Sequence, residues 1–338
     1  MRGRTSPSLA IVKYWGKESV ARNIPATASL AVTLGGLDTV TEIRAAGPDC
    51  LDSVTVGGAE QDPARYSRFF DEARRLFRFQ GSFTASSDNS FPSSAGLASS
   101  SSGFAALALG CARLAGLPDG EESLALASEA ARVGSASAAR AVYGGFTLLP
   151  AGGLRAESLH DDGWWPEFRI LVAVTSNAAK NASTRAAMES TRLTSPYYGA
   201  WVEDSRGVAR EALAALHGKD LERLGELARL SYMRMHGSAL AADPPVVYWL
   251  PASLAVIGAC AELRARGIQA WETMDAGPQV KIICLEKDMA AISSALRERL
   301  PDLGLIESRP GKAPDLTDIP CDPVHAETSS PRLQAAAR

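Results

Sequence analysis

The chain has 338 residues, of which 46% are hydrophobic and 22% charged, and its formal net charge is −3. This balance is typical of a globular protein and excludes the disordered and fibrous classes. A nucleic-acid-binding protein would show a basic excess, and a membrane protein would show a run of about 18 apolar residues. The sequence has neither feature.

Cysteine and histidine are sparse. The five cysteines stand at positions 50, 111, 260, 284 and 321 without a CxxC pair, and none of the four histidines forms an HxxxH or HExxH pair. Disulfides and zinc sites are therefore not expected, and a reducing compartment fits. The first residues are polar and lack the apolar segment of a secretory signal. These features predict a cytoplasmic protein.

Short strands alternate with helices in the first half of the chain. Runs that are β-branched or alternate in polarity predict strands at residues 9–12, 28–34, 40–45, 82–87 and 141–149. Apolar residues at helical spacing predict helices at residues 65–79, 104–117 and 121–133. Gly116 and Pro118 end the second of these helices.

The second half is mostly helical. Strands are expected at residues 168–174, 270–274 and 280–284, and helices at 198–216, 220–239, 251–267 and 288–299. Strands and helices mix without regular βαβ alternation, which indicates the α+β class. The length permits two domains, and we place them at residues 1–176 and 177–320, with a boundary uncertain by about ten residues. The polar residues 321–338 are expected to form a disordered tail.

A segment rich in serine, residues 91–103, leads directly into the expected helix at 104–117. Small residues let a ligand approach the backbone, and a helix N-terminus offers free N–H groups and the positive end of a dipole. Serine hydroxyls add hydrogen bonds to phosphate or a ligand for Mg²⁺. The segment lacks the Gly-Lys-Ser/Thr ending of a Walker loop. Two interpretations stay open at this point, a polyphosphate cradle and an ordinary helix cap.

Two lysines lie four residues apart near the N-terminus. Lys13 and Lys17 follow a short strand and bracket Gly16 in the string Lys-Tyr-Trp-Gly-Lys. From a turn, two such side chains are able to clamp an anion. Solvated lysines at the end of a surface strand are the alternative.

Two further motifs carry side chains suited to chemistry. In Gly-Ser-Ala-Ser-Ala-Ala-Arg, residues 134–140, small residues expose Ser135 and Ser137, and Arg140 presents a planar fork that suits a carboxylate. A helix–helix turn with a surface arginine is the alternative. Asp275 stands between two expected strands and precedes Ala-Gly-Pro. It is placed either to act as a base or to cap a turn.

In chain order, these motifs resemble those of one enzyme family. Pro-x-x-x-Gly-Leu-x-Ser-Ser, residues 92–100, resembles a signature of the GHMP kinase superfamily. The strings at residues 10–17, 134–140 and 274–281 resemble motifs of the mevalonate diphosphate decarboxylase family, and Lys-Asn-Ala-Ser-Thr-Arg-Ala-Ala-Met, residues 180–188, is similar to another segment of it. The matches follow one another in family order along most of the chain.

The resemblance implies a role for each matching residue. Three residues, Asp275, Lys13 and Arg140, would form a catalytic trio: the aspartate orients or deprotonates a hydroxyl, the lysine stabilises charge and the arginine holds a carboxylate. The residues implied in substrate binding, mainly at its phosphates, are Tyr14, Lys17, Ser135, Ser137, Thr184 and Arg185. Those implied in binding ATP are Asn89, Ser94, Gly96, Leu97, Ala98, Ser99 and Ser100. Ser99 or Ser100 would contact the Mg²⁺ ion bound to ATP.

The family's architecture and reaction are implied in the same way. We expect a two-domain α+β GHMP kinase fold with the active site in the inter-domain cleft, a homodimer, and no nucleic-acid or membrane partner. In the implied reaction, ATP phosphorylates the tertiary hydroxyl of mevalonate 5-diphosphate. Phosphate and carbon dioxide then leave, and isopentenyl diphosphate is formed.

Several positions depart from the family pattern. Glu18 stands where the family usually has arginine after the second lysine, Thr27 and Ala28 stand where it has asparagine and serine, and Gln279 replaces asparagine. Glu18 places a negative charge beside the residues expected to bind phosphate. Decarboxylation of mevalonate 5-phosphate is therefore an alternative.

Two further functions are compatible with the same fold. A kinase would phosphorylate the tertiary hydroxyl and stop, and a ligand sensor would bind without reaction, since a fold does not fix a function. The presence of the complete catalytic trio argues against both.

Overall fold

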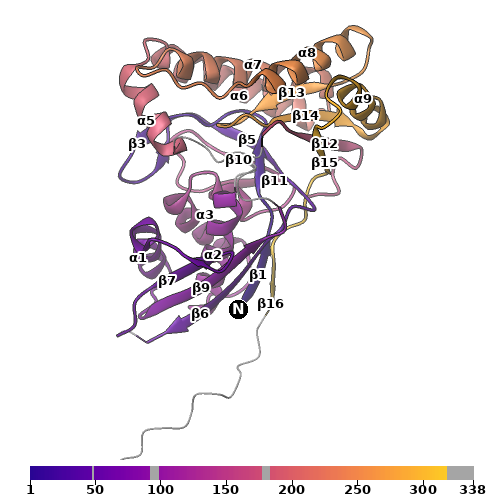
Figure 1. The fold of residues 1–338 in the computed structure, drawn as a ribbon. Helices are drawn as coiled ribbons and strands as arrows, with labels where there is room; N and C mark the ends of the chain where they lie inside the picture. The colour runs from indigo at the N-terminus through magenta and orange to yellow at the C-terminus, as the bar shows by residue number, and fades with distance from the viewer. Residues whose placement is uncertain (48, 92–98, 177–182, 318–338) are drawn as a thin grey trace, which may run out of the picture.

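The computed structural model describes residues 1–47, 49–91, 99–176 and 183–317 (Figure 1). The N-terminal half is built on a mixed sheet whose strand order is β16 (Asp315–Thr317), β1 (Arg2–Thr5), β6 (Thr39–Ala46), β9 (Ser82–Asn89), β7 (Ser53–Val56) and β8 (Ala59–Glu60). The pair β6 and β9 is antiparallel along its whole length, whereas β7 runs parallel to β9. The sheet therefore joins segments far apart in sequence.

Helices pack against this sheet and bury an aromatic core. They are α1 (Ser67–Phe77), α2 (Ser99–Leu114), α3 (Glu121–Gly134) and the single turn α4 (Ala138–Ala141). Phe69, Phe70, Phe83 and Phe104 form a continuous set of ring contacts between α1, α2 and β9. Helix α2 begins five residues before the start expected from the sequence, at Ser99 and not at residue 104. Its first turn consists of serines, so an apolar periodicity does not reveal it.

A second, antiparallel sheet lies between the two halves. Its order is β11 (Glu157–His160), β10 (Phe146–Leu149), β5 (Ser29–Thr33) and β2 (Ser8–Ala10). The strand expected at residues 141–149 is wrong over its first part, which contains the end of α4 and a turn. Gly145 has a φ of +61° and the carbonyl of His160 occupies the place of a side chain there. The turn delays the strand until Phe146.

The C-terminal half is a helical layer over an antiparallel sheet (Figure 1). The sheet order is β13 (Trp271–Met274), β14 (Val280–Leu285), β12 (Phe168–Val174) and β15 (Gly304–Ser308). The helices are α5 (Thr184–Thr194), α6 (Tyr198–His217), α7 (Leu221–Leu240), α8 (Pro251–Ala265) and α9 (Glu286–Arg299). Of these, α5 was not expected, because its many threonines and serines weaken the helical signal.

The two halves share a core. Leu9 and Phe146 of the middle sheet belong to the same buried cluster as Val208 of α6 and Leu224 of α7. The chain also returns, since Arg2 of β1 pairs with Thr317 of β16. The mixed two-domain α+β architecture expected from the sequence is confirmed.

The remaining expectations about organisation have different outcomes. The boundary between residues 176 and 177 stays a prediction, because residues 177–182 lie outside the described part, as does the tail at 321–338. Within the described residues, no helix combines the length and apolar character that a bilayer crossing requires.

Candidate active site

A cleft of about 790 Å³ lies between the two halves of the molecule. Its lining comes from the segment after β2, the start of α2, the turn between α3 and α4, the start of α5, and the loop after β13. Most of the site residues predicted from the sequence line it, namely Lys13, Tyr14, Lys17, Ser100, Ser135, Ser137, Arg140, Thr184, Arg185 and Asp275. The tertiary structure therefore brings together motifs separated by up to 262 positions.

Asp275 forms the centre of a charged cluster. Its Oδ1 accepts a hydrogen bond from Lys13 Nζ at 2.8 Å, and its Oδ2 lies 3.1 Å from Lys281 Nζ. The lysine side chains are 1% and 3% exposed, whereas the aspartate side chain is 29% exposed and faces the cleft. The carboxylate is thus held from behind by two buried cations and remains open to a ligand.

The charges in this cluster perturb one another. Burial alone would raise the pKa of Asp275, but Lys13 and Lys281 outweigh it and hold the pKa well below its usual value. Burial lowers the pKa of Lys13 to about 8, although its pairing with Asp275 acts in the opposite direction. At neutral pH the aspartate is therefore ionised and Lys13 remains mostly protonated.

Arg140 supplies a further cation at the same end of the cleft. Its side chain is buried, and burial lowers its pKa to about 10. The Nε and Nη1 atoms have no hydrogen-bond partner among the described residues. A buried guanidinium with free donors is costly unless an anion binds it, and a carboxylate matches its planar fork. The interpretation of Arg140 as a surface residue is excluded.

The other end of the cleft is also basic but more open. Lys17 is buried at the start of β3 (Lys17–Ser19). Its pKa is lowered to about 8, mainly by burial and to a smaller extent by the positive charge of Arg185. Arg185 is exposed in the first turn of α5, where Ser183 caps the helix by accepting from the Ala186 N–H. The phenolic oxygen of Tyr14 is buried without a partner among the described residues. This end is able to donate hydrogen bonds to a polyanion.

Ser135 and Ser137 stand between the two ends of the cleft. Their hydroxyl oxygens are 3.1 Å apart, and both side chains are half-buried. Ser135 ends α3 and Ser137 begins α4, so the break between these helices turns both hydroxyls to the cleft. At the end of α3, Gly134 has no side chain, and the ring of Phe104 occupies the space where a Cβ atom would lie.

Three basic residues at the site were not predicted from the sequence. Lys281 pairs with Asp275, and Arg65 lines the cleft at its open end. Arg68 lies farther out, in a side cavity of about 390 Å³ that also includes Arg65 and Arg185. Lys281 was recognisable, because it faces the same edge as Asp275 across the turn between β13 and β14. The two arginines gave no signal, since Arg65 ends a short 3-10 helix (Pro63–Arg65) and Arg68 lies in the first turn of the amphipathic helix α1.

Only some of the residues expected to bind ATP lie in the described part of the chain. Ser94, Gly96, Leu97 and Ala98 lie outside the described residues. Ser100 lines the cleft, whereas Ser99, at the start of α2, does not line it. Asn89 ends β9 and its Oδ1 accepts a hydrogen bond from Thr39 at 2.6 Å. Its role at the nucleotide stays a prediction.

The described residues contain no cluster of three or more His, Cys, Asp or Glu side chains that would hold a metal ion. Hydroxyls such as that of Ser100, at the start of α2, fit an ion that is carried on nucleotide phosphates and mostly hydrated.

The departures from the family pattern have structural explanations at two positions. Thr27 is fully buried, and its hydroxyl accepts from the Trp15 N–H at 3.1 Å, so it fixes the turn after Lys13. Gln279 accepts from the Thr175 N–H at 2.6 Å and donates to the Ser176 carbonyl, so it joins β14 to the end of β12. Glu18 is exposed and is not part of the cleft lining.

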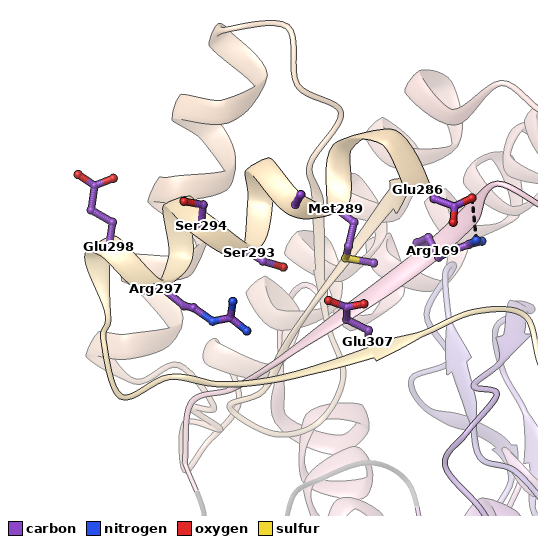
Figure 2. Close-up of a pocket in the computed structure, with 9 residues that line it drawn as sticks. Arg169, Glu286, Met289, Ser293, Ser294, Arg297, Glu298 and Glu307 are labelled. Carbon is purple, nitrogen blue, oxygen red and sulfur yellow. Dashed lines mark ion pairs between the residues drawn. The ribbon is translucent and has the colours of Figure 1, made fainter.

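A larger hollow of about 910 Å³ lies on the outer face of the C-terminal half (Figure 2). It is bounded by α9 and β15, and at one end Arg169 and Glu286 form an ion pair at 2.9 Å. Glu298 and Glu307 offset the charge of Arg297 around it. None of the residues predicted for the site lies there. The cleft is the candidate active site because its cations converge, not because of its size.

Comparisons with known proteins identify the family of the whole chain. A family model described as the diphosphomevalonate decarboxylase-like N-terminal domain matches residues 5–160, and one for the mevalonate 5-diphosphate decarboxylase C-terminal domain matches residues 170–328. The diphosphomevalonate decarboxylase of Gibberella zeae is 33% identical over 330 residues, which cover 89% of this chain and 85% of that protein.

Solved structures are similar over nearly the whole chain. One of mevalonate diphosphate decarboxylase from Enterococcus faecalis has a TM-score of 0.85 at 31% identity, and covers 94% of this chain and 98% of its own. Another, described as MDDEF in complex with MVAPP, AMPPCP and magnesium, has a TM-score of 0.86 at 31% identity and the same coverage.

The fold and the cleft define a two-domain protein of the GHMP kinase class. Within that class, the two family models cover both halves of the molecule. The chain belongs to the diphosphomevalonate decarboxylase family.

Proposed function

We propose that the protein catalyses the ATP-dependent decarboxylation of mevalonate 5-diphosphate to isopentenyl diphosphate, with release of ADP, phosphate and carbon dioxide. The observation that carries this proposal is the buried guanidinium of Arg140, which keeps two donors without a partner among the described residues and belongs to a residue lining the cleft that also holds the Lys13–Asp275 pair. A carboxylate bound there would lie beside a group able to orient a hydroxyl, and the substrate carries both.

The first chemical step is transfer of the γ-phosphoryl group to the tertiary hydroxyl. Asp275 accepts a hydrogen bond from this hydroxyl and aims its oxygen at phosphorus. Because the pKa of Asp275 is held well below its usual value, the carboxylate is a weak proton acceptor in the ground state. The proton therefore moves late, when the forming O–P bond has made the hydroxyl acidic. Positioning is the main contribution of Asp275.

The second step breaks the C–O bond to the new phosphate and the bond to the carboxylate. The electron pair of the C–CO₂ bond becomes the double bond of the product, and phosphate leaves with the C–O pair. Lys13 and Lys281 place positive charge beside the departing phosphate. Arg140 holds the carboxylate in the orientation required for its departure.

The open end of the cleft is suited to the substrate's diphosphate. Lys17, Arg185 and Arg65 line it, and Arg68 extends the positive charge into the side cavity. None of these three arginines forms an ion pair within the described part of the chain. This excess of positive charge offsets Glu18 and favours the diphosphate over the monophosphate as substrate.

ATP and Mg²⁺ are included in the proposal. The relative solved with MVAPP, AMPPCP and magnesium supports both. When bound, the ion neutralises phosphate charge during phosphoryl transfer. The start of α2, with Ser99 and Ser100, is the described element nearest to the expected phosphate loop. A homodimer and a cytoplasmic location stay predictions.

The test is release of carbon dioxide and ADP by the purified protein with Mg-ATP. Mevalonate 5-diphosphate and mevalonate 5-phosphate are compared as substrates. We expect equal amounts of ADP and carbon dioxide, and a higher kcat/KM for the diphosphate. ADP without carbon dioxide would identify a kinase, preference for the monophosphate would identify the alternative substrate, and absence of both products would contradict the proposal.

A further inference from the structure

Helix α7 passes behind the reacting cluster and contacts both members of the Lys13–Asp275 pair. The backbone N–H of Lys13 donates to the hydroxyl of Ser231 at 2.8 Å, and both groups are buried. Five positions along the helix, the ring of His236 lies against the backbone of Met274 and Asp275. One helix of the C-terminal half therefore holds a lysine of the N-terminal half and the aspartate of its own half.

His236 lies in an aromatic enclosure. Its ring stacks on Trp249 at a centroid distance of 5.7 Å, and the edges of Tyr248 and Tyr232 lie at 5.8 and 5.9 Å. The residue is 2% exposed, and its Nε2 has no hydrogen-bond partner within the described chain. The ring is thus held in one orientation by packing, beside the loop that carries Asp275.

The charge state of His236 matters for this position. Burial and the nearby charge of Lys13 lower its pKa to about 4, so the ring is neutral at physiological pH. A neutral ring beside this backbone does not compete with Lys13 and Lys281 for the carboxylate of Asp275. The cations that face this carboxylate remain Lys13, Lys281 and, farther away, Arg140.

Neither Ser231 nor His236 lines the cleft, so neither touches the substrate. We propose that both are positioning residues: Ser231 sets the backbone of Lys13, His236 sets the backbone of Asp275, and α7 thereby fixes the geometry of the pair across the two halves. The inference rests on the proposed function for its catalytic consequence. Its structural consequence, the pairing of Lys13 with Asp275, does not depend on that function.

The experiment uses matched serine variants on the same helix. Ser231→Ala removes the bond to Lys13, whereas Ser238→Ala removes a buried hydroxyl that donates to the Met235 carbonyl at 2.8 Å within α7. His236→Phe keeps an aromatic ring and removes its two ring nitrogens, and His236→Gln restores a side-chain N–H donor. Thermal midpoints show which variants are folded.

The first readout is the pKa of Lys13, followed by NMR of ¹³C-labelled lysine, with Lys13→Arg to assign the signal. Pairing with Asp275 raises this pKa against the effect of burial. A loosened pair must therefore lower it, and we expect a decrease of about half a unit or more in Ser231→Ala and His236→Phe. Ser238→Ala should leave it unchanged. This readout needs no activity, so it tests the inference even if the proposed reaction fails.

The second readout is steady-state kinetics. Because small misplacements of a reacting group reduce rate strongly, we expect kcat to fall about 10-fold in Ser231→Ala and up to about 100-fold in His236→Phe, with KM values nearly constant. His236→Gln should recover part of the loss. Ser231→Ala and His236→Phe variants that match Ser238→Ala in both the pKa of Lys13 and kcat would overturn the inference. An inactive wild-type protein would instead contradict the proposed function.

Discussion

The two ends of the cleft present positive charge in different ways. At the reacting end, Lys13, Lys281 and Arg140 are almost fully buried, and two of them are paired with Asp275. At the phosphate end, Arg65, Arg68 and Arg185 are exposed. The first end is dehydrated and fixed before a ligand arrives, whereas the second surrounds the buried Lys17 with solvated, adaptable arginines.

This difference predicts that the two ends contribute to different steps, one to the reaction and the other to substrate binding. Buried, preorganised charges stabilise a transition state strongly because they cannot be screened or rearranged. Exposed charges mainly contribute binding, and salt weakens them. Variants at the reacting end should therefore reduce kcat, and variants at the phosphate end should raise KM.

The largest effect is expected for Asp275→Asn. The amide keeps the shape of the side chain but removes the charge that orients the hydroxyl, so kcat should fall by at least about 10³-fold. Carbon dioxide release measures the activity, and circular dichroism checks that the fold is retained. Asp161→Asn, at an exposed loop residue, is the control. Activity near that of the wild type would remove Asp275 from the mechanism.

A smaller loss is expected for Arg140→Lys. The substitution keeps one positive charge but loses the fork that matches a carboxylate, so kcat/KM should fall by about 10²-fold. Carbon dioxide formation should fall more than ADP formation, because the lost contact holds the leaving carboxylate. A product ratio that stays at one, with full activity, would show that the carboxylate binds elsewhere.

The pH dependence should separate activity from stability. Lys13 and Lys17 both have a pKa of about 8, so kcat/KM should fall above this pH with a limiting slope of −2 in a logarithmic plot. Lys17→Arg keeps its charge and should reduce the slope to −1.

The free energy of unfolding should change with pH in the opposite direction to kcat/KM. Both lysines have folded-state pKa values below their usual value of 10.5, so the unfolded chain binds more protons between about pH 8 and pH 10. Their contribution to the free energy of unfolding therefore rises with pH over this window while activity falls. Urea unfolding at several pH values measures it, and in Lys13→Met this contribution should be smaller.

The smallest effect is expected for Arg68, at the exposed phosphate end of the cleft. Arg68→Ala should raise KM for the diphosphate by about threefold and leave KM for the monophosphate unchanged, because an exposed charge contributes on the order of 0.5 kcal/mol. The difference should disappear at high salt. Arg44→Ala, an exposed arginine of β6, is the matched control. An equal change for both substrates would show that Arg68 does not act on the terminal phosphate.

Local signals in the sequence were sufficient for most of the helices but for only half of the strands in the described residues. Helices with strong apolar periodicity, such as α1, α6 and α7, lie close to their expected positions. The strands β1, β7, β15 and β16 were missed because they are short, and partners such as Thr317 for Arg2 are distant in sequence. The energy of strand pairing depends on partners that lie far away in sequence, so a local pattern does not reveal it.

For the site, the motifs in the sequence were enough to predict that Lys13, Arg140 and Asp275 act together. How these side chains are arranged depends on the fold. It buried Lys13 and Arg140, placed Lys281 on the second oxygen of Asp275, and set α7 behind the pair. The physical reason is that burial and charge pairing depend on segments more than 200 positions apart, whose contacts exist only once both halves share a core.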